Sequence, residues 1–264
     1  MSITDFLGLK STHNPHRWIL PVEQRICTPG DFLFGGAALA AGIEAMEQTT
    51  GRKTVWATAQ YLSFARRPAI IDIDVEVPVS GNNISQARAI AHVGDKEVIA
   101  VNAALGDRPN SPEGVWAECP NVARPEDCDV VQLPTEYPPN IHNHVEKRLV
   151  HGKFGFFDFG EPSDDGRLIF WCKFPNVEMS AATLAMIADF MPSGVGNVLN
   201  RRAGGNSLDN TLRVIALEPT EWVLCDVHIH ALARGFGHGR IHLWSQNGNL
   251  LATANQSVIV RIHD

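Results

Sequence analysis

The chain has 264 residues, of which 44% are hydrophobic and 19% are charged, and its formal net charge at pH 7 is −7. This balance is typical of an ordinary globular protein with one or two domains. An acidic chain without a basic run is not expected to bind nucleic acid. The five cysteines are odd in number and have no C-x-x-C spacing, which indicates reduced thiols in a cytoplasmic protein.

The sequence predicts neither a signal peptide at the N-terminus nor a membrane-spanning segment. The N-terminus lacks the basic segment and the apolar core of a signal peptide. The longest apolar run, residues 32–43, is too short to span a bilayer. We therefore expect a cytoplasmic protein without membrane insertion.

The first half of the sequence predicts one strand, one long helix and four further strands. Residues 17–27 alternate in the manner of a strand. A helix is expected over 34–49, because Leu39, Ile43 and Met46 recur on one helical face, and Gly51 is suited to end it. Four strand-like runs follow, separated by turn signals: 55–64, 69–79, 85–93 and 97–105. The pattern predicts a sheet with one helix along its concave face.

The second half repeats this order after a proline-rich segment. Residues 106–140 contain seven prolines and little periodicity, which is typical of a linker. A strand is expected over 168–174 and a helix over 179–202, interrupted by Pro192, Gly194 and Gly196. Residues 207–256 alternate as strands, and Asn247-Gly248 marks a hairpin between two of them.

The two halves match at a constant offset of 152 residues. Asp74 and Asp226 share an apolar-Asp-Val context, and 226 − 74 = 152. The same offset places Arg88 on Arg240 and residues 98–100 on residues 250–252. A sustained match of the apolar pattern predicts two copies of one unit. We expect an N-terminal unit over 1–110, a linker over 111–144 and a C-terminal unit over 145–264.

The ordered motifs of this chain resemble those of the type II acyl-CoA thioesterases, which have an α+β double hotdog fold. In that fold each of two tandem units wraps an antiparallel sheet around a long helix. The resemblance covers nearly the whole chain. Its motifs are Phe34-Gly35-Gly36 at the start of the first helix, Ser207-Leu208-Asp209, Glu221-Trp222-Val223-Leu224, Ala233-Arg234-Gly235-Phe236 and Gly248-Asn249-Leu250-Leu251-Ala252 leading to Gln256.

The resemblance implies an enzyme that hydrolyses a fatty acyl-CoA thioester to the free acid and CoA. It also implies lipid metabolism, a homo-oligomer and no cofactor. In the family an Asp, a Thr or Ser, and a Gln together hold the hydrolytic water. By motif the Asp corresponds to Asp209 and the Gln to Gln256, whereas the third position falls on His230, which has no hydroxyl. These three are the expected catalytic residues.

These residue types suit the chemistry of thioester hydrolysis. A carboxylate can accept the proton of the attacking water, and a glutamine amide can orient that water with one donor and one acceptor. The developing oxyanion needs fixed donors, which backbone N–H groups at a helix start can supply. Gly35 and Gly36 are the candidates for that role.

Three alternatives remain open from the sequence. A non-catalytic acyl-CoA or lipid-binding hotdog protein would keep the fold without turnover. A hotdog hydratase or dehydratase would need a His five residues after its Asp, where this chain has Val214 after Asp209 and Gly194 after Asp189. The His228-x-His230 pair lies on one face of a strand, as in some metal sites, but a third ligand is not evident and no metal is expected.

Overall fold

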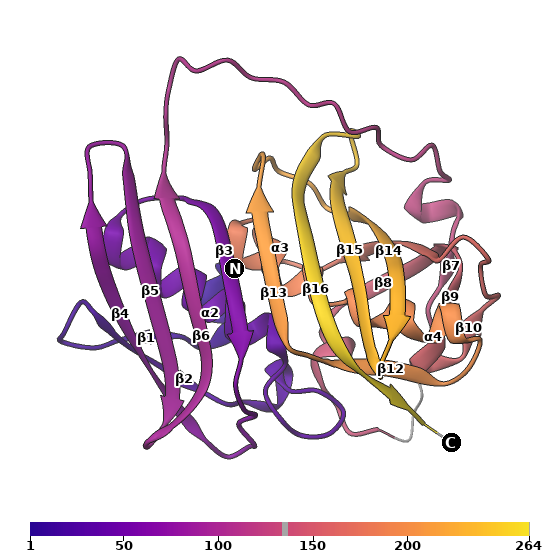
Figure 1. Cartoon of the computed structure of the whole chain (residues 1–264), viewed down its shortest axis with the longest axis horizontal. Helices are drawn as coiled ribbons and strands as arrows, with labels where there is room; N and C mark the ends of the chain where they lie inside the picture. Colours follow the sequence, from indigo (N-terminus) through magenta and orange to yellow (C-terminus); the bar gives the residue numbers. More distant parts are fainter. Residues whose placement is uncertain (134–136, 264) are drawn as a thin grey trace.

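A computed structural model describes residues 1–133 and 137–263 of the chain. Within these residues one antiparallel sheet of 14 strands forms the body of the protein (Figure 1). Its strands follow the order β1-β2-β4-β5-β6-β3-β13-β16-β15-β14-β11-β8-β7, and β12 pairs with β16 beside this path.

The N-terminal half contributes one long helix and the first six strands. Helix α2, Gly35–Thr50, ends at Gly51 in the left-handed conformation, because a residue without Cβ closes a helix there at low cost. The other elements are α1 (Ile3–Leu7), β1 (Lys10–Ser11), β2 (Arg17–Pro21), β3 (Thr54–Tyr61), β4 (Ile70–Ser80), β5 (Ile84–Val93) and β6 (Lys96–Gly106).

The C-terminal half contains its helices and strands in the same order, but its long helix is broken. Helix α3, Ala181–Ala188, is followed by the short 3₁₀ turn Met191–Ser193 and by α4, Gly194–Leu199, as the interruption by Pro192 predicts. Its strands are β7 (Asp129–Val130), β8 (Glu146–His151), β9 (Lys153–Phe154), β10 (Phe159–Gly160), β11 (Arg167–Lys173), β12 (Ala203–Ser207), β13 (Asp209–Val214), β14 (Val223–Ala233), β15 (Phe236–Ser245) and β16 (Leu250–Ile262).

The two halves of the sheet mirror each other in strand order. The first half runs β2-β4-β5-β6-β3 and the second β11-β14-β15-β16-β13, so corresponding strands occupy corresponding places. Shifting β4 and β5 by 152 gives 222–232 and 236–245, which match β14 to within one residue and β15 in full. Strands β3 and β13 pair directly, with Asp209 opposite Gln60, and this pairing joins the halves into one sheet.

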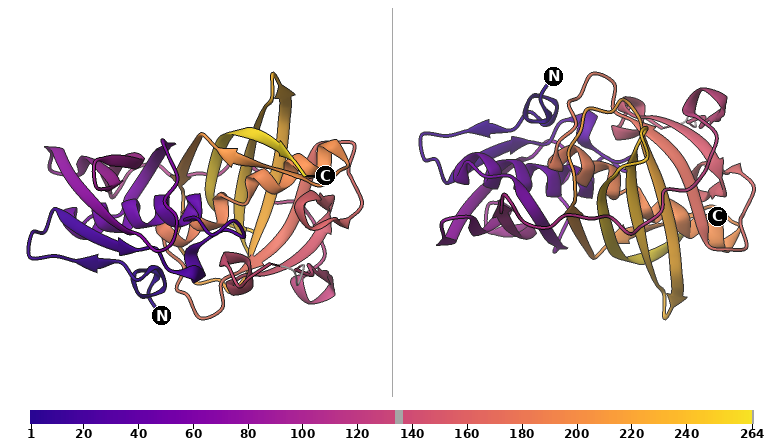
Figure 2. Two further views of the ribbon diagram at one scale, coloured as in Figure 1. Left: turned by 90° about the horizontal axis from the view of Figure 1, so that it is seen from below. Right: turned by 90° about the horizontal axis from the view of Figure 1, so that it is seen from above.

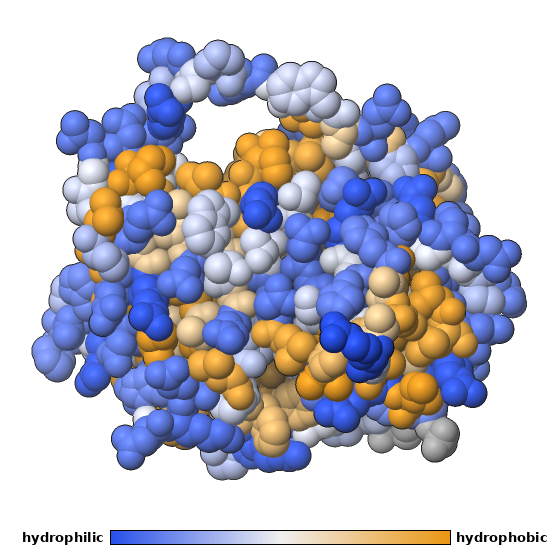
Figure 3. All heavy atoms as spheres, viewed as in Figure 1, coloured by the Kyte–Doolittle hydropathy of each residue, from blue (hydrophilic) through white to orange (hydrophobic). Residues whose placement is uncertain are grey.

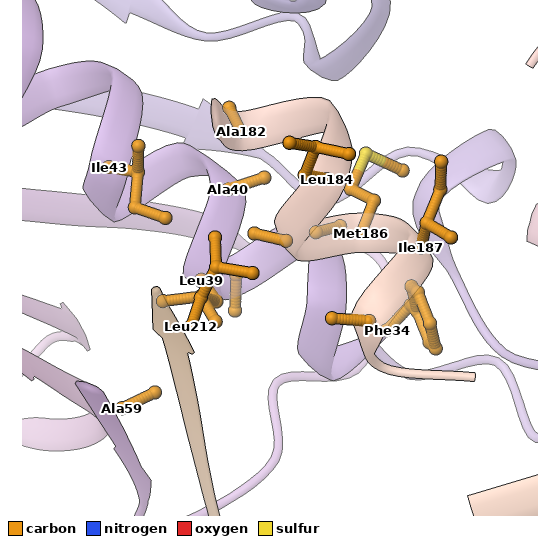
Figure 4. Packing of buried hydrophobic residues seen from close by; sticks show 14 of the residues in the cluster. Phe34, Leu39, Ala40, Ile43, Ala59, Ala182, Leu184, Met186, Ile187 and Leu212 are labelled. Atoms are coloured by element: carbon orange, nitrogen blue, oxygen red, sulfur yellow. The ribbon is translucent and has the colours of Figure 1, made fainter. Parts of the chain in front are cut away.

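The sheet curves around the helices, which form the centre of the molecule (Figure 2). Every residue of α3 is buried, and α2 buries eleven of its residues. Ala40 of α2 lies beside Leu184 of α3 in the shared core (Figure 4). The helices of the two units therefore pack against each other beneath the sheet, and burial of these apolar faces stabilises both.

The remaining features are the linker between the two units and one long apolar stretch. The segment after β6 crosses from one half to the other beyond the ends of the strands (Figure 1). Residues 134–136 of the expected linker and residue 264 of the expected C-terminal unit lie outside the described residues. The stretch Ala181–Leu199 has the length and hydropathy of a membrane span, but most of it is buried inside the protein, as in the core helix of a soluble fold.

Candidate active site

Asp189 is a buried carboxylate at the end of α3, where its side chain meets both halves of the molecule. It is 5% exposed and immediately follows the last residue of the helix. Its Oδ2 accepts a hydrogen bond of 2.6 Å from the backbone N–H of Gly36. Its Oδ1 accepts from Gln256 Nε2 at 2.5 Å and from Ser207 Oγ at 3.2 Å. One carboxylate thus joins three segments that are far apart in the sequence.

The start of α2 approaches this carboxylate so closely that it has no room for side chains. A Cβ added at Gly35 would lie 2.8 Å from Asp189 Oδ2, and one added at Gly36 would lie 2.9 Å from Asp189 Cβ and 3.0 Å from Met186 Cα. The Phe-Gly-Gly motif at the helix start is therefore a consequence of packing against the end of α3.

Burial raises the pKa of the Asp189 carboxyl from 3.8 to about 6, although hydrogen bonds from Gln256, the Gly36 N–H and Ser207 favour its charged form. Desolvation of the charge is the larger effect here. The positive end of the α2 dipole also favours the ionised carboxylate. Asp189 is consequently a stronger base than an exposed aspartate, yet it is largely ionised at neutral pH.

Ser207 and Gln256 come from neighbouring strands and contact each other as well as the carboxylate. Ser207 ends β12, which pairs with β16, and Gln256 lies on β16 with a 3% exposed side chain. Gln256 Nε2 donates to Ser207 Oγ at 2.6 Å. Alternation along β16 buries Ala254, Gln256 and Val258 on the helix-facing side of the sheet, which directs the amide toward Asp189.

Four buried polar atoms near this group have no hydrogen-bond partner among the described residues. They are Gln256 Oε1, both polar atoms of the Asn210 side chain, and Tyr61 Oη. Burial raises the pKa of the Tyr61 phenol well above 10, and the nearby Asp189 charge adds to this, whereas the Asn210 side chain opposes it. Buried polar atoms of native proteins are normally satisfied, so several unsatisfied ones together indicate a place for water or ligand.

The structure does not bring Asp209 and Gln256 together, contrary to expectation. Asp209 lies on β13 next to the buried Asn210, and successive residues of a strand point to opposite faces. The Asp209 side chain is therefore on the outer face, where its Oδ1 accepts from the backbone N–H of Ser257 at 2.8 Å. It lines an open depression of about 550 Å³ with Arg234 and His238.

His230 also lies apart from the buried group. Ile229 is opposite Gly239, which is opposite Gln256, so Ile229 occupies the inward position in that row. His230 follows it at a β-bulge, is exposed, and packs its ring against the His228 ring at 5.1 Å. Burial lowers the pKa of His230, with His228 and Arg240 contributing. Within 1–133 and 137–263, no three His, Cys, Asp or Glu side chains are placed to hold a metal ion.

Gly35 and Gly36 lie at the buried group, but Gly36 does not have the role that was expected of it. The Gly36 N–H donates to Asp189 and so is not free for an oxyanion. Two members of the group, Asp189 and Ser207, were not among the predicted site residues. Asp189 could have been noticed as the single charged residue in the apolar stretch 179–200, and Ser207 as the hydroxyl in the Ser-Leu-Asp motif.

Two tandem sheet-and-helix units with a buried polar site where they meet define a double hotdog protein. The profile of the acyl-CoA thioesterase C-terminal domain matches residues 125–260, which is more than half of the chain. The chain belongs to this acyl-CoA thioesterase family.

Solved structures agree with this assignment. A candidate thioesterase from Novosphingobium aromaticivorans is 32% identical with a TM-score of 0.84, covering 94% of this chain and 96% of its own. A hotdog protein of unknown function from Alicyclobacillus acidocaldarius is 19% identical with a TM-score of 0.86, covering 99% and 98%. An acyl-CoA thioesterase II from Mycobacterium marinum is 17% identical with a TM-score of 0.76, covering 99% of each chain. The last two show the fold alone. A search of curated proteins gave no match.

Proposed function

We propose that this protein hydrolyses a fatty acyl-CoA thioester with a water held by Asp189, Ser207 and Gln256. The observation that carries the proposal is the closed set of hydrogen bonds among these three side chains in a buried site. They provide the Asp, hydroxyl and Gln that the family resemblance implies, with Asp189 in the role expected for Asp209 and Ser207 in the role expected for His230.

In the proposed reaction Asp189 acts as the general base. It takes a proton from the bound water as the water oxygen forms a bond to the thioester carbonyl carbon. The tetrahedral intermediate then collapses, the carbon–sulfur bond breaks, and the leaving CoA sulfur takes the proton back from Asp189. Ser207 and Gln256 orient the water and the carboxylate, which lowers the entropic part of the barrier.

The surroundings of the site support an apolar acyl group. Phe34 and Phe190, the neighbours in sequence of Gly35 and Asp189, stack with ring centroids 5.3 Å apart and are buried. Met186 of α3 approaches Gly36. Ligand sites of this kind are mostly apolar with few polar groups. Beyond the end of β3 and the start of β13 the surface is hollowed and bordered by hydrophobic residues (Figure 3), which supports entry from that side.

The test is an assay of the purified protein with saturated acyl-CoA esters of increasing chain length, following release of free thiol. We expect turnover of at least one ester and loss of at least about 100-fold in kcat for Ser207→Ala and Gln256→Ala together, on the scale of removing the groups that position a catalytic water. Tight acyl-CoA binding without turnover would contradict the proposal and support the binding-protein alternative.

A further inference from the structure

Of the two backbone donors expected for the oxyanion, the Gly36 N–H already binds Asp189, which leaves at most the Gly35 N–H and calls for further donors. Thioester hydrolysis places negative charge on the former carbonyl oxygen, and donors aimed at that oxygen supply much of the rate enhancement. Groups suited to this task are buried beside the base, carry a hydrogen and have no other acceptor. Among the described residues near Asp189, Tyr61 Oη and Asn210 Nδ2 meet all three conditions.

Tyr61 comes from the N-terminal unit and is held at the site by its backbone. Its N–H donates to the carbonyl oxygen of Leu208 at 2.9 Å, which fastens the end of β3 to the segment between β12 and β13. A Cβ added at Gly35 would lie 3.1 Å from the Tyr61 ring and 2.8 Å from Asp189 Oδ2. The phenol and the carboxylate therefore flank the same residue at the start of α2.

Asn210 comes from the C-terminal unit and reaches the same place from the sheet. It is completely buried on β13, between the outward-facing Asp209 and Thr211. Thr211 is occupied on the outer face by a hydrogen bond of 2.8 Å to Thr58. The Asn210 side chain lies near Tyr61 and Asp189 and favours ionisation of both, but it forms no hydrogen bond of normal geometry with either. Leaving a buried amide without partners is costly, so its retention here is consistent with a transient partner.

We infer that Tyr61 Oη and Asn210 Nδ2 donate hydrogen bonds to the thioester carbonyl oxygen and hold the oxyanion that forms there. The inference rests on the proposed function, since it concerns the same reaction. It makes Tyr61 a catalytic residue supplied by the first unit to a base supplied by the second, so that neither hotdog unit holds a complete site. The phenol stays protonated throughout the neutral range because it is buried beside a carboxylate.

The first experiment compares the only two tyrosines of the chain, Tyr61 and Tyr137. Tyr61→Phe removes the hydroxyl and keeps the ring against Gly35. Tyr137→Phe is the matched control, because its hydroxyl accepts from Arg202 at 2.9 Å and lies outside the site. We expect Tyr61→Phe to lower kcat about 100-fold with little change in KM, as for loss of an oxyanion donor. A kcat within about threefold of that of Tyr137→Phe overturns the inference.

A second measurement separates donation from a structural role. In the Tyr137→Phe background, biosynthetic replacement of tyrosine by a fluorotyrosine changes Tyr61 alone and makes its phenol more acidic. An alkaline fall in kcat should then appear at a lower pH than in the protein with ordinary tyrosine, in which burial raises the Tyr61 pKa well above 10, because the ionised phenolate no longer donates. An unmoved alkaline limb refutes the role of Tyr61.

Asn210→Leu provides the corresponding test on the second donor. Replacing an unsatisfied buried amide by an apolar side chain of similar size should leave the melting temperature unchanged or higher. We expect kcat to fall about 100-fold in the same protein. Retained kcat overturns the assignment of Asn210. If the unaltered protein hydrolyses no acyl-CoA, the proposed function itself fails, whereas an active wild type with active Tyr61→Phe and Asn210→Leu variants refutes only this inference.

Discussion

Replacing Asp189 by asparagine should remove activity and at the same time alter the pH dependence of stability. The variant keeps the size of the side chain but cannot accept a proton from water. Loss of a general base lowers kcat by about 100- to 10,000-fold. In the wild type, kcat should fall about tenfold per pH unit below pH 6, because the carboxyl pKa is raised to about 6 and the protonated form is inactive.

The stability effect follows from the same raised pKa. Between pH 3.8 and about 6 the folded state binds the Asp189 proton and the unfolded state has lost it, so wild-type stability falls as pH rises through this window. Two pKa units at about 1.4 kcal/mol each give about 3 kcal/mol. The unfolding free energy of Asp189→Asn minus that of the wild type should therefore increase by about 2.4 kcal/mol between pH 4 and pH 7.

Urea denaturation across this pH range measures the difference, and a disulfide reagent that reacts with thiols in acid follows CoA release. A blank without substrate corrects for the five cysteines of the chain. The reasoning is refuted if Asp189→Asn keeps wild-type kcat, or if an acid limb near pH 6 persists in its residual activity. A pH-independent stability difference would show that Asp189 does not titrate as its burial implies.

Four further variants test other parts of the structure. Asp209→Asn should keep kcat within about threefold in the thiol-release assay, because this outer-face residue lies across the sheet from the base. Gly36→Ala should lower kcat about 100-fold by pushing on Asp189, whereas Gly204→Ala, whose Cβ meets nothing within 4 Å, should not. Lys147 lies beside His142, and burial lowers its pKa from 10.5 to about 8. Lys147 therefore loses its proton at a lower pH in the folded protein than in the unfolded chain. Relative to Lys147→Met, wild-type stability in urea should rise by about 3 kcal/mol from pH 8 to 10.5, and an unchanged difference would contradict this.

The sequence by itself determined the order and type of the elements. Helix α2, Gly35–Thr50, and strand β5, Ile84–Val93, coincide with the ranges expected from periodicity to within one residue. The offset of 152 correctly placed β14 and β15. These features depend on local propensity and on apolar spacing, which act between neighbours in the chain and are therefore visible in the sequence.

The proposed catalytic group was decided by tertiary structure. Asp209 and Asn210 are adjacent in sequence, but successive side chains of β13 point to opposite faces of the sheet. The register of β13 against β3 and β16 determines that Asp209 points outward and Asn210 points to the site. Asp189 reaches Gly36, 153 residues away, only because α3 packs against α2. A single charged residue at the end of an apolar helix looks like a cap in sequence. Its raised pKa and its contacts with Ser207 and Gln256 exist only when three segments are brought together, because burial and long-range hydrogen bonds are properties of the folded chain.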